Sequence, residues 1–304
     1  MHCREARVVA FWRREGKMAN GRVSIAAVVL TLLAAGTALA QQAETEQAFD
    51  RYVADGEARI ARQRSSAESF LKGDSLSTRE REVIQRLKRG EVVIEKQGNS
   101  PKEIHGGLVH DWTGTVFIPG VNVEQVLSRV KDYDHLERYY TPHVMRSQLI
   151  SQKGDELHVF VRLREHRVVT VVLDTEYDVH YGRLDATHQY SISRSTRVSE
   201  IADPGTASEH VLTKAKNHGF MWRLNTYWAF EQEADGVVVE CEAISLTRDI
   251  PTGLNWLIGP FVIGIPRESL QFTLEATRSA TIEFATKVGV LAGEEKIRSQ
   301  TILN

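Results

Sequence analysis

The feature that most constrains this fold is an alternation of apolar and polar residues that recurs along the middle of the chain. Apolar side chains occupy every second position from Leu157 to Leu163, and again from Val169 to Tyr181 with Thr175 as the exception. A period of two is typical of antiparallel strands with one buried face. Comparable segments lie at 111–118, 143–152, 186–200 and on both sides of a turn at 234–236. The pattern therefore predicts an antiparallel sheet of about six strands.

Helical segments flank these strands. Phe49, Tyr52, Val53 and Ile60 fall on one face of a helix within 41–90, and a long helix is expected over 267–287. Strands bracketed by helices indicate an α+β fold. We expect a curved antiparallel sheet wrapped around the long C-terminal helix, with a cavity between them. The N-terminal helices have too little apolar surface to fold alone, so they either dock on this unit or pair with another chain.

The first 40 residues resemble an export signal. Arg22 precedes an apolar run, Ser24 to Leu33, and the small residues Ala38 and Ala40 follow. An N-terminal membrane anchor is the alternative, but the run is shorter than the ~20 residues that span a bilayer. We therefore predict cleavage after Ala40 and a periplasmic or secreted protein. The expected segments are a signal peptide (1–40), an N-terminal helical extension (41–100), a sheet-and-helix domain (101–290) and a C-terminal tail (291–304).

Net charge and cysteine content restrict the possible partners and the possible role of cysteine. The formal net charge of the chain is -2, whereas nucleic-acid binders usually carry a basic excess, so no nucleic-acid partner is expected. Of two cysteines, only Cys241 remains after the predicted cleavage, and its mid-strand position favours a small buried side chain.

The turn at 234–236 determines how the last two strands pair. A three-residue loop places Glu233 opposite Val237. Arg223, Asn225 and Tyr227 then share a face with Ser245 and with several small residues. Small side chains on a curved sheet leave room, and the few polar groups could orient a ligand. The alternative is a close helix–sheet contact that uses small residues to pack tightly.

Residues 249–265 form an apolar segment interrupted by glycine and proline, which favours an irregular loop. Trp256 and Phe261 are its large aromatic side chains. Three readings remain open. The loop is a mobile lid over the cavity, a patch for transient contact with a membrane or partner, or a segment packed on the end of the sheet.

A set of motifs resembles an exported bacterial subgroup of the START-like helix-grip superfamily (SRPBCC), which includes lipid-transfer and polyketide cyclase-like proteins. The resemblance covers about residues 105–285. It implies a curved antiparallel sheet gripping a C-terminal helix around a hydrophobic tunnel, with Tyr133, Tyr139 and Tyr140 near its mouth. Activities in the superfamily range from lipid carriage to aromatic cyclisation, so the resemblance does not decide the function. The motifs are Trp112-x-Gly-x-x-Phe117-Ile-Pro-Gly120, Lys131-Asp-Tyr-Asp134, Tyr139-x-x-Pro142, Gly219-Phe-x-Trp222-Arg-Leu-Asn-x-Tyr-Trp228, Ser245-Leu-Thr-Arg248-Asp-Ile-Pro251 and Pro266-Arg-Glu-Ser-Leu270.

The sequence contains few recognisable catalytic or cofactor-binding motifs. The histidines are scattered without metal-ligand spacing, and no phosphate loop, nucleophile elbow or dinucleotide fingerprint occurs, so no metal or cofactor is expected. Glu240 and Glu242 share one face of a strand. They form a solvated or salt-bridged face, with Arg248 or Arg194 as partners. If the register differs by one residue, they enter the cavity as candidate acids or bases.

Three functions fit these observations. The first is a non-enzymatic binding or transfer protein for a hydrophobic small molecule or lipid. The second is a cyclase- or hydrolase-type enzyme that uses Arg223, Tyr227 and a buried glutamate in the same cavity. The third is a periplasmic interaction domain with a filled core. The candidate ligand-binding residues are Tyr133, Tyr139, Arg223, Asn225, Tyr227, Ser245, Trp256 and Phe261.

Overall fold

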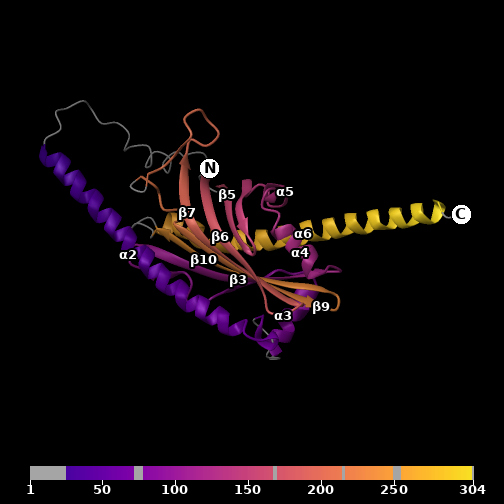
Figure 1. Cartoon of the computed structure of the whole chain (residues 1–304). Helices are drawn as coiled ribbons and strands as arrows, with labels where there is room; N and C mark the ends of the chain where they lie inside the picture. The colour runs from indigo at the N-terminus through magenta and orange to yellow at the C-terminus, as the bar shows by residue number, and fades with distance from the viewer. Residues whose placement is uncertain (1–24, 72–77, 167–169, 214–215, 249–254, 303–304) are drawn as a thin grey trace.

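The computed structural model describes residues 25–71, 78–166, 170–213, 216–248 and 255–302. Side chains are described for 43–67, 69–71, 82–166, 170–213, 216–248 and 264–288. The order of elements is helical, then mostly strand, then helical (Figure 1). The helices are α2 (Ile25–Gln63), the short 3₁₀ turn η2 (Ala67–Ser69), α3 (Thr78–Lys88), α4 (Val123–Val130), α5 (Leu136–Tyr139) and α6 (Asn255–Ile302).

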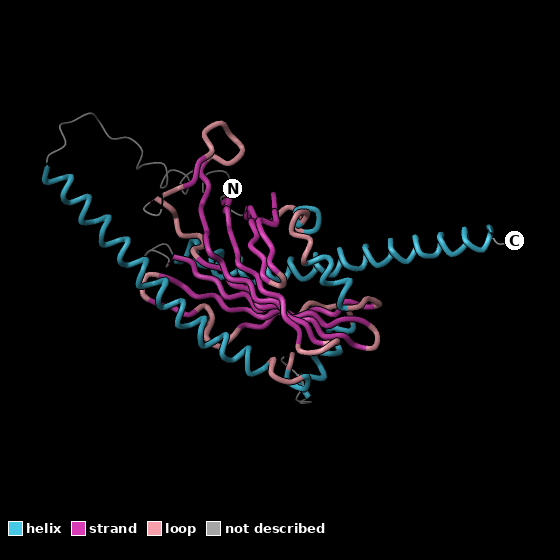
Figure 2. Tube along the Cα trace, in the orientation of Figure 1, coloured by secondary structure: helices cyan, strands magenta, loops and turns pink. Residues whose placement is uncertain are grey.

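One 10-stranded antiparallel sheet forms the centre of the molecule. Its main path runs β1-β3-β10-β9-β7-β6-β5-β4, while β2 and β8 pair with β3 and β7. Figure 2 shows the long strands bending as they cross the molecule. The strands are β1 (Val93–Lys96), β2 (Lys102–Ile104), β3 (Gly107–Pro119), β4 (Val144–Lys153), β5 (Glu156–His166), β6 (Thr170–Arg183), β7 (His188–Ala202), β8 (His210–Val211), β9 (Arg223–Glu233) and β10 (Gly236–Arg248).

The two faces of the sheet pack against different helices, and we call them the α6 face and the α2 face. The main core lies on the α6 face, where Val116, Val239 and Phe230 pack with Leu270 and Leu274 of α6. Gly114 allows this approach, because a Cβ there would lie 2.5 Å from Leu274 Cδ1. A second core lies on the other face, where Phe49, Val53 and Ile60 of α2 meet Tyr227, Ile244 and Leu246. The predicted α+β fold, with a sheet around a C-terminal helix, is confirmed.

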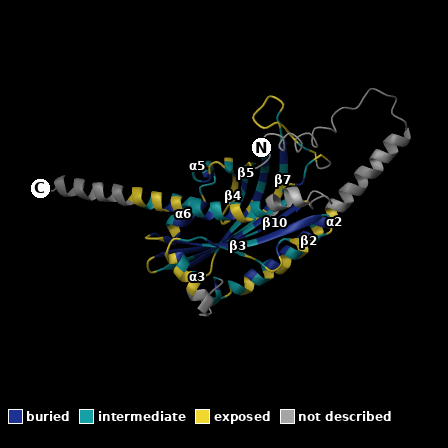
Figure 3. Cartoon of the chain, turned by 180° about the vertical axis from the view of Figure 1, so that it is seen from behind, coloured by how far each residue is buried: buried dark blue, intermediate teal, exposed yellow. Residues whose placement is uncertain are grey.

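The N-terminal helix α2 docks on the sheet of the same chain, so the first of the two alternatives is confirmed. The described part of α2 turns buried residues to the sheet and exposed residues away from it (Figure 3). β1, which falls in the expected N-terminal extension, pairs with β3. Residues 1–24 and the side chains up to residue 42 lie outside the description, so cleavage after Ala40 stays a prediction. Among the described residues, no helix combines the length and apolar character needed to cross a bilayer.

The predicted register of the last two strands is wrong by one residue. Gly236 pairs with Glu233, so the turn consists of Ala234 and Asp235 alone. Gly236 belongs to β10 and not to the turn. A Cβ there would lie 2.3 Å from the carbonyl oxygen of Ile118, so glycine permits the close approach of β3. The shift places Arg223, Asn225 and Tyr227 on the α2 face, while Ser245 lies on the α6 face.

The expectation of an irregular loop over 249–265 is also wrong from Asn255 onward. α6 begins there and continues to Ile302, so it includes Pro260, Pro266 and most of the expected C-terminal tail. A proline removes one backbone donor from a helix, a local cost that the other hydrogen bonds of so long a helix can outweigh. Residues 249–254 and the side chains of Trp256 and Phe261 lie outside the description, so their predicted roles stay predictions.

Candidate functional site

The centre of the α6 face carries a row of four half-buried side chains, three small ones and a tryptophan. Ser193 of β7 pairs with Thr226 of β9, Thr226 pairs with Ala243 of β10, and Ala243 pairs with Trp112 of β3. Since directly paired residues point to the same side of a sheet, these four form one line across the central strands. We call this line the central row. All four of its side chains keep accessible surface.

Half-buried apolar residues border the central row along β9. Leu224 precedes Thr226 by two positions and Trp228 follows it by two, so both point to the α6 face. Further along the same face, Val116, Phe230 and Val239 have no accessible surface. The α6 face is therefore closely packed at one end and accessible in the middle.

The row that follows, toward the start of β3, is polar but uncharged. His110 pairs with Ser245, and its Nε2 lies 3.0 Å from Oγ1 of Thr247. Burial lowers the pKa of His110 to about 4, because the surroundings disfavour an imidazolium. His110 is therefore a neutral ring at physiological pH. Ser245, a predicted site residue, lies beside it and is buried.

Tyrosines close the α6 face on the side of β6. Tyr133, a predicted site residue, lies with its hydroxyl 2.8 Å from that of Tyr181. Burial raises the pKa of both phenols, so both stay protonated. The Tyr140 hydroxyl lies 2.9 Å from Thr277 of α6, and burial raises the Tyr140 pKa to about 12. These contacts connect the α4–α5 segment with β6 and α6.

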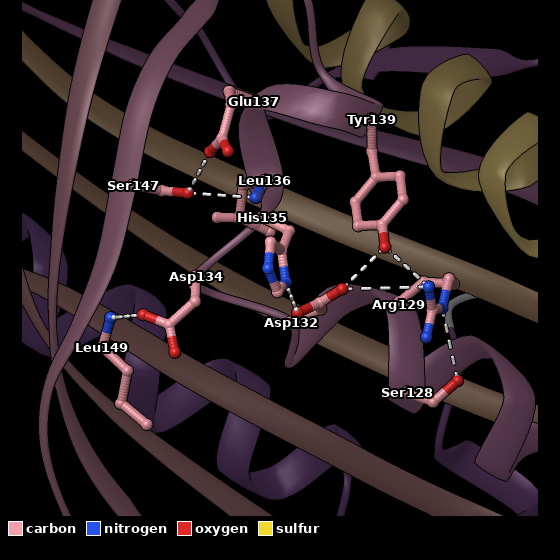
Figure 4. Close-up of polar contacts among 10 residues, drawn as sticks. All are labelled: Ser128, Arg129, Asp132, Asp134, His135, Leu136, Glu137, Tyr139, Ser147 and Leu149. Carbon is pink, nitrogen blue, oxygen red and sulfur yellow. Dashed lines mark hydrogen bonds and ion pairs between the residues drawn. The ribbon is translucent and has the colours of Figure 1, made fainter.

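Tyr139, also predicted to bind ligand, is held in a polar network at the end of α4 (Figure 4). Arg129 donates to its hydroxyl at 2.6 Å, and that hydroxyl donates to Asp132 at 2.6 Å. Burial opposes the ionisation of Asp132, but hydrogen bonds from Tyr139 and His135 lower its pKa overall. The network fixes the α4–α5 segment, and the Tyr139 hydroxyl is already engaged.

Three predicted site residues lie on the α2 face, and two of them, Arg223 and Tyr227, contact α2. Arg223 forms an ion pair with Asp50 at 3.2 Å. The Tyr227 hydroxyl donates to Glu57 at 2.9 Å, and the Asn225 amide oxygen accepts from the backbone of Ser195 at 3.2 Å. The expectation that these residues share one face with Ser245 is therefore wrong. The one-residue error in the register is the reason.

The α2 face also contains a buried acidic pair. Tyr52 of α2 donates to Asp111 at 2.9 Å, and Arg59 of α2 forms an ion pair with Glu242. Burial, followed by the nearby charge of Glu242, raises the pKa of Asp111 to about 7. Glu242 thus belongs to a salt-bridged face, although its partner is Arg59 and neither Arg194 nor Arg248. Arg194 instead pairs with Glu57, at 2.6 Å.

No metal centre is assembled in the part of the chain that the structure describes, because no group of three or more suitable side chains converges there. Cys241 is buried, as predicted, and burial raises its pKa, which disfavours the thiolate.

Two signals could have revealed the central row. Ser191, Ser193 and Ser195 alternate along one strand, so a row of serines on one face is legible in the sequence. Thr226 joins Ala243 only when the turn contains two residues. The predicted three-residue turn pairs Thr226 with a different residue, so the central row could not be recognised from it.

The comparisons with known proteins concern the architecture. No protein-family model and no curated protein matches the chain. Solved structures do match part of the chain. The sheet and the long C-terminal helix by themselves define an α+β fold.

Three of these structures illustrate the similarity. A STAR-related lipid transfer protein from Xanthomonas axonopodis is 21% identical, with 59% of this chain and 96% of that chain covered and a TM-score of 0.40. A START superfamily protein from Mycobacterium smegmatis is 11% identical, with 58% and 99% covered and a TM-score of 0.39. The Zhui aromatase/cyclase from Streptomyces sp. R1128 is 12% identical, with 57% and 93% covered and a TM-score of 0.37. These similarities assign no ligand to this chain.

Proposed function

We propose that the chain binds or transfers a hydrophobic small molecule or lipid, which it holds between the α6 face of the sheet and α6. One observation supports this most directly. Ala243 lies on the α6 side of a central strand, yet it keeps accessible surface along with Ser193, Thr226 and Trp112. In a fully packed core those positions would have none. We infer a hollow above the central row, and apolar walls favour an apolar ligand.

A binding role fits the described residues better than catalysis. The enzyme hypothesis required Arg223, Tyr227 and a buried glutamate to line the cavity. Arg223 and Tyr227 lie on the α2 face, where they contact Asp50 and Glu57. Glu242 lies on the same face, paired with Arg59. That set is therefore separated from the central row by the sheet itself.

The first experiment is to purify the protein, extract it with organic solvent and identify co-purified small molecules by mass spectrometry. The variant Ala243→Leu adds bulk to the floor of the proposed hollow, whereas Ala61→Leu makes the same change at an exposed position of α2. We expect a stoichiometric ligand in the wild type and in Ala61→Leu, and a much reduced amount in Ala243→Leu. An empty wild-type protein that also binds no hydrophobic probe would refute the proposal and favour an interaction domain with a filled core.

We also propose that the protein is exported and cleaved after Ala40. The described contacts of α2 with the sheet include one from Thr45, whose hydroxyl donates to the His105 carbonyl at 2.7 Å. Cleavage after Ala40 leaves that contact intact. N-terminal sequencing of protein from the periplasm or medium should give Gln41 as the first residue. A chain that keeps residues before Gln41 would contradict this proposal.

Transient membrane contact through residues 249–265 remains a further proposal, supported by the apolar sequence of that segment. Co-sedimentation with neutral phospholipid vesicles tests it. We expect binding by the wild type and reduced binding when Trp256 and Phe261 are replaced by serine. Equal binding by both proteins would contradict it.

A further inference from the structure

The central row contains two hydroxyls with no partner in the described chain. Ser193 and Thr226 are direct cross-strand neighbours on the α6 face, which places their Cβ atoms about 4.5–5.5 Å apart. Neither hydroxyl forms a hydrogen bond with another described residue, and both side chains are half-buried. Each can donate one hydrogen bond and accept others.

Three other hydroxyls near this face are already engaged. The Ser191 and Ser245 hydroxyls of the adjacent rows have no hydrogen bond with a described residue either, but both residues are buried. Ser195, two positions along β7 from Ser193, accepts from the backbone of Leu224 at 3.0 Å. Thr175 donates to the Val161 carbonyl at 2.7 Å, and Thr277 donates to the Thr273 carbonyl at 2.8 Å. Ser193 and Thr226 differ from these residues in having both accessible surface and unused hydrogen-bonding capacity. Such groups in an otherwise apolar hollow are suited to orient a ligand.

The surroundings specify the charge of the group that these hydroxyls would meet. The adjacent row on one side contains Ser191, Trp228 and Cys241, and the row on the other contains Leu224, Ser245 and the neutral His110. None of these side chains carries a positive charge. A carboxylate or phosphate placed here would lose its hydration without gaining a cation from either row, which is costly. A neutral oxygen would lose less and would gain the two hydroxyls.

We propose that Ser193 and Thr226 form a specificity-determining pair that recognises a neutral oxygen, that of a ketone, alcohol or phenol, on an otherwise apolar ligand. The inference rests on the proposed function, since it assigns the polar end of the same binding site. The pair predicts a ligand preference that the proposed function alone does not predict. A hollow without this pair would select ligands by size and apolar surface alone, whereas the pair adds a preference for one oxygen atom.

The test uses three probes with one aromatic skeleton: 2-acetylnaphthalene, 2-ethylnaphthalene and 2-naphthoate. Their dissociation constants are measured with the full chain by quenching of tryptophan fluorescence. We expect the ketone to bind about tenfold more tightly than the hydrocarbon, which corresponds to about 1.4 kcal/mol for well-placed hydrogen bonds. We expect the carboxylate to bind more weakly than either.

The double variant Ser193→Ala/Thr226→Val removes both hydroxyls and nearly preserves side-chain volume. It should lose the preference for the ketone while keeping the affinity for the hydrocarbon. Thr196→Val, at an exposed position of β7, is the matched control and should keep the preference. This comparison separates loss of recognition from loss of folding, because hydrocarbon binding reports an intact hollow.

The outcomes distinguish the two proposals. Two results would refute recognition by Ser193 and Thr226: equal binding of ketone and hydrocarbon by the wild type, or a preference for the ketone that persists in the double variant. Neither result would contradict the proposed hollow. If none of the three probes binds, both the hollow and the pair are refuted.

Discussion

Asp111 gives the sharpest prediction about stability, because its carboxyl group is buried between α2 and the sheet. Tyr52, Arg59 and Glu242 are the titratable and charged groups around it. Its pKa is raised from 3.8 to about 7, so the folded chain retains a proton that the unfolded chain has released. The stability contributed by this group is therefore greatest at low pH. It falls as the pH rises from about 4 to about 7, and then levels off.

The expected change in unfolding free energy follows from the difference between the pKa values of Asp111 in the unfolded and folded chain. Each pH unit between the two pKa values costs 1.36 kcal/mol of unfolding free energy, so the rise from pH 5 to pH 7 costs at most about 3 kcal/mol. Local opening between α2 and the sheet would expose the Asp111 carboxyl to water without global unfolding, so we expect on the order of 1–2 kcal/mol. Asp111→Asn retains an acceptor for the Tyr52 hydroxyl and cannot ionise. The variant should therefore gain stability relative to the wild type by this amount between pH 5 and pH 8.

The assay is urea unfolding at pH 5 and pH 8, followed by tryptophan fluorescence and circular dichroism. Comparison of variant and wild type at each pH cancels the other titrating groups. Asp55→Asn, at an exposed position of α2, is the control and should show the same difference at both pH values. If Asp111→Asn is destabilised equally at pH 5 and pH 8, the reasoning about the buried carboxyl is refuted.

Three other perturbations test the packing on both faces. Gly114→Ala brings a methyl group against α6 and should destabilise the fold by about 1–2 kcal/mol, because flexible side-chain ends can partly yield; a melting temperature equal to that of the wild type would contradict this. Arg59→Leu leaves the buried Glu242 carboxylate without its guanidinium and should cost about 3 kcal/mol in urea unfolding, most of which Glu242→Gln in the same chain should restore. Glu165→Ala removes the acceptor of the Ser269 hydroxyl, 2.9 Å away, and should raise amide hydrogen exchange in that part of α6 about fivefold; unchanged exchange would show that this contact does not hold the helix.

Much of the fold could be predicted because it depends on local patterns. Alternation identified the long strands. The N-cap of α4 is equally local, because Asn122 accepts from the Gln125 backbone and the Gln125 side chain accepts in return. Burial of Cys241 also followed from its position in an apolar strand.

What could not be predicted depends on contacts between distant segments. The role of Gly236 is decided by β3, more than 110 positions earlier in the chain, and not by the turn beside it. The partner of Glu242 comes from α2, a helix that the sequence could not place on a particular face. The register error placed Arg223, Asn225 and Tyr227 on the same face as Ser245, although they lie on the opposite side of the sheet. For that reason the site was predicted less well than the fold.

The alternation along β10 has a consequence for how this chain can diverge. Glu240 and Glu242 lie under α2, while Cys241 and Ala243 lie toward α6, so successive residues of one strand meet opposite requirements. Surface turns usually tolerate insertions and deletions. Here, adding or removing one residue between Glu233 and Gly236 could shift β10 by one position along β9. The carboxylates of β10 would then point to the α6 face, and its small residues would point to the arginines of the α2 face. Related chains should therefore differ freely in the composition of this turn, but keep its length.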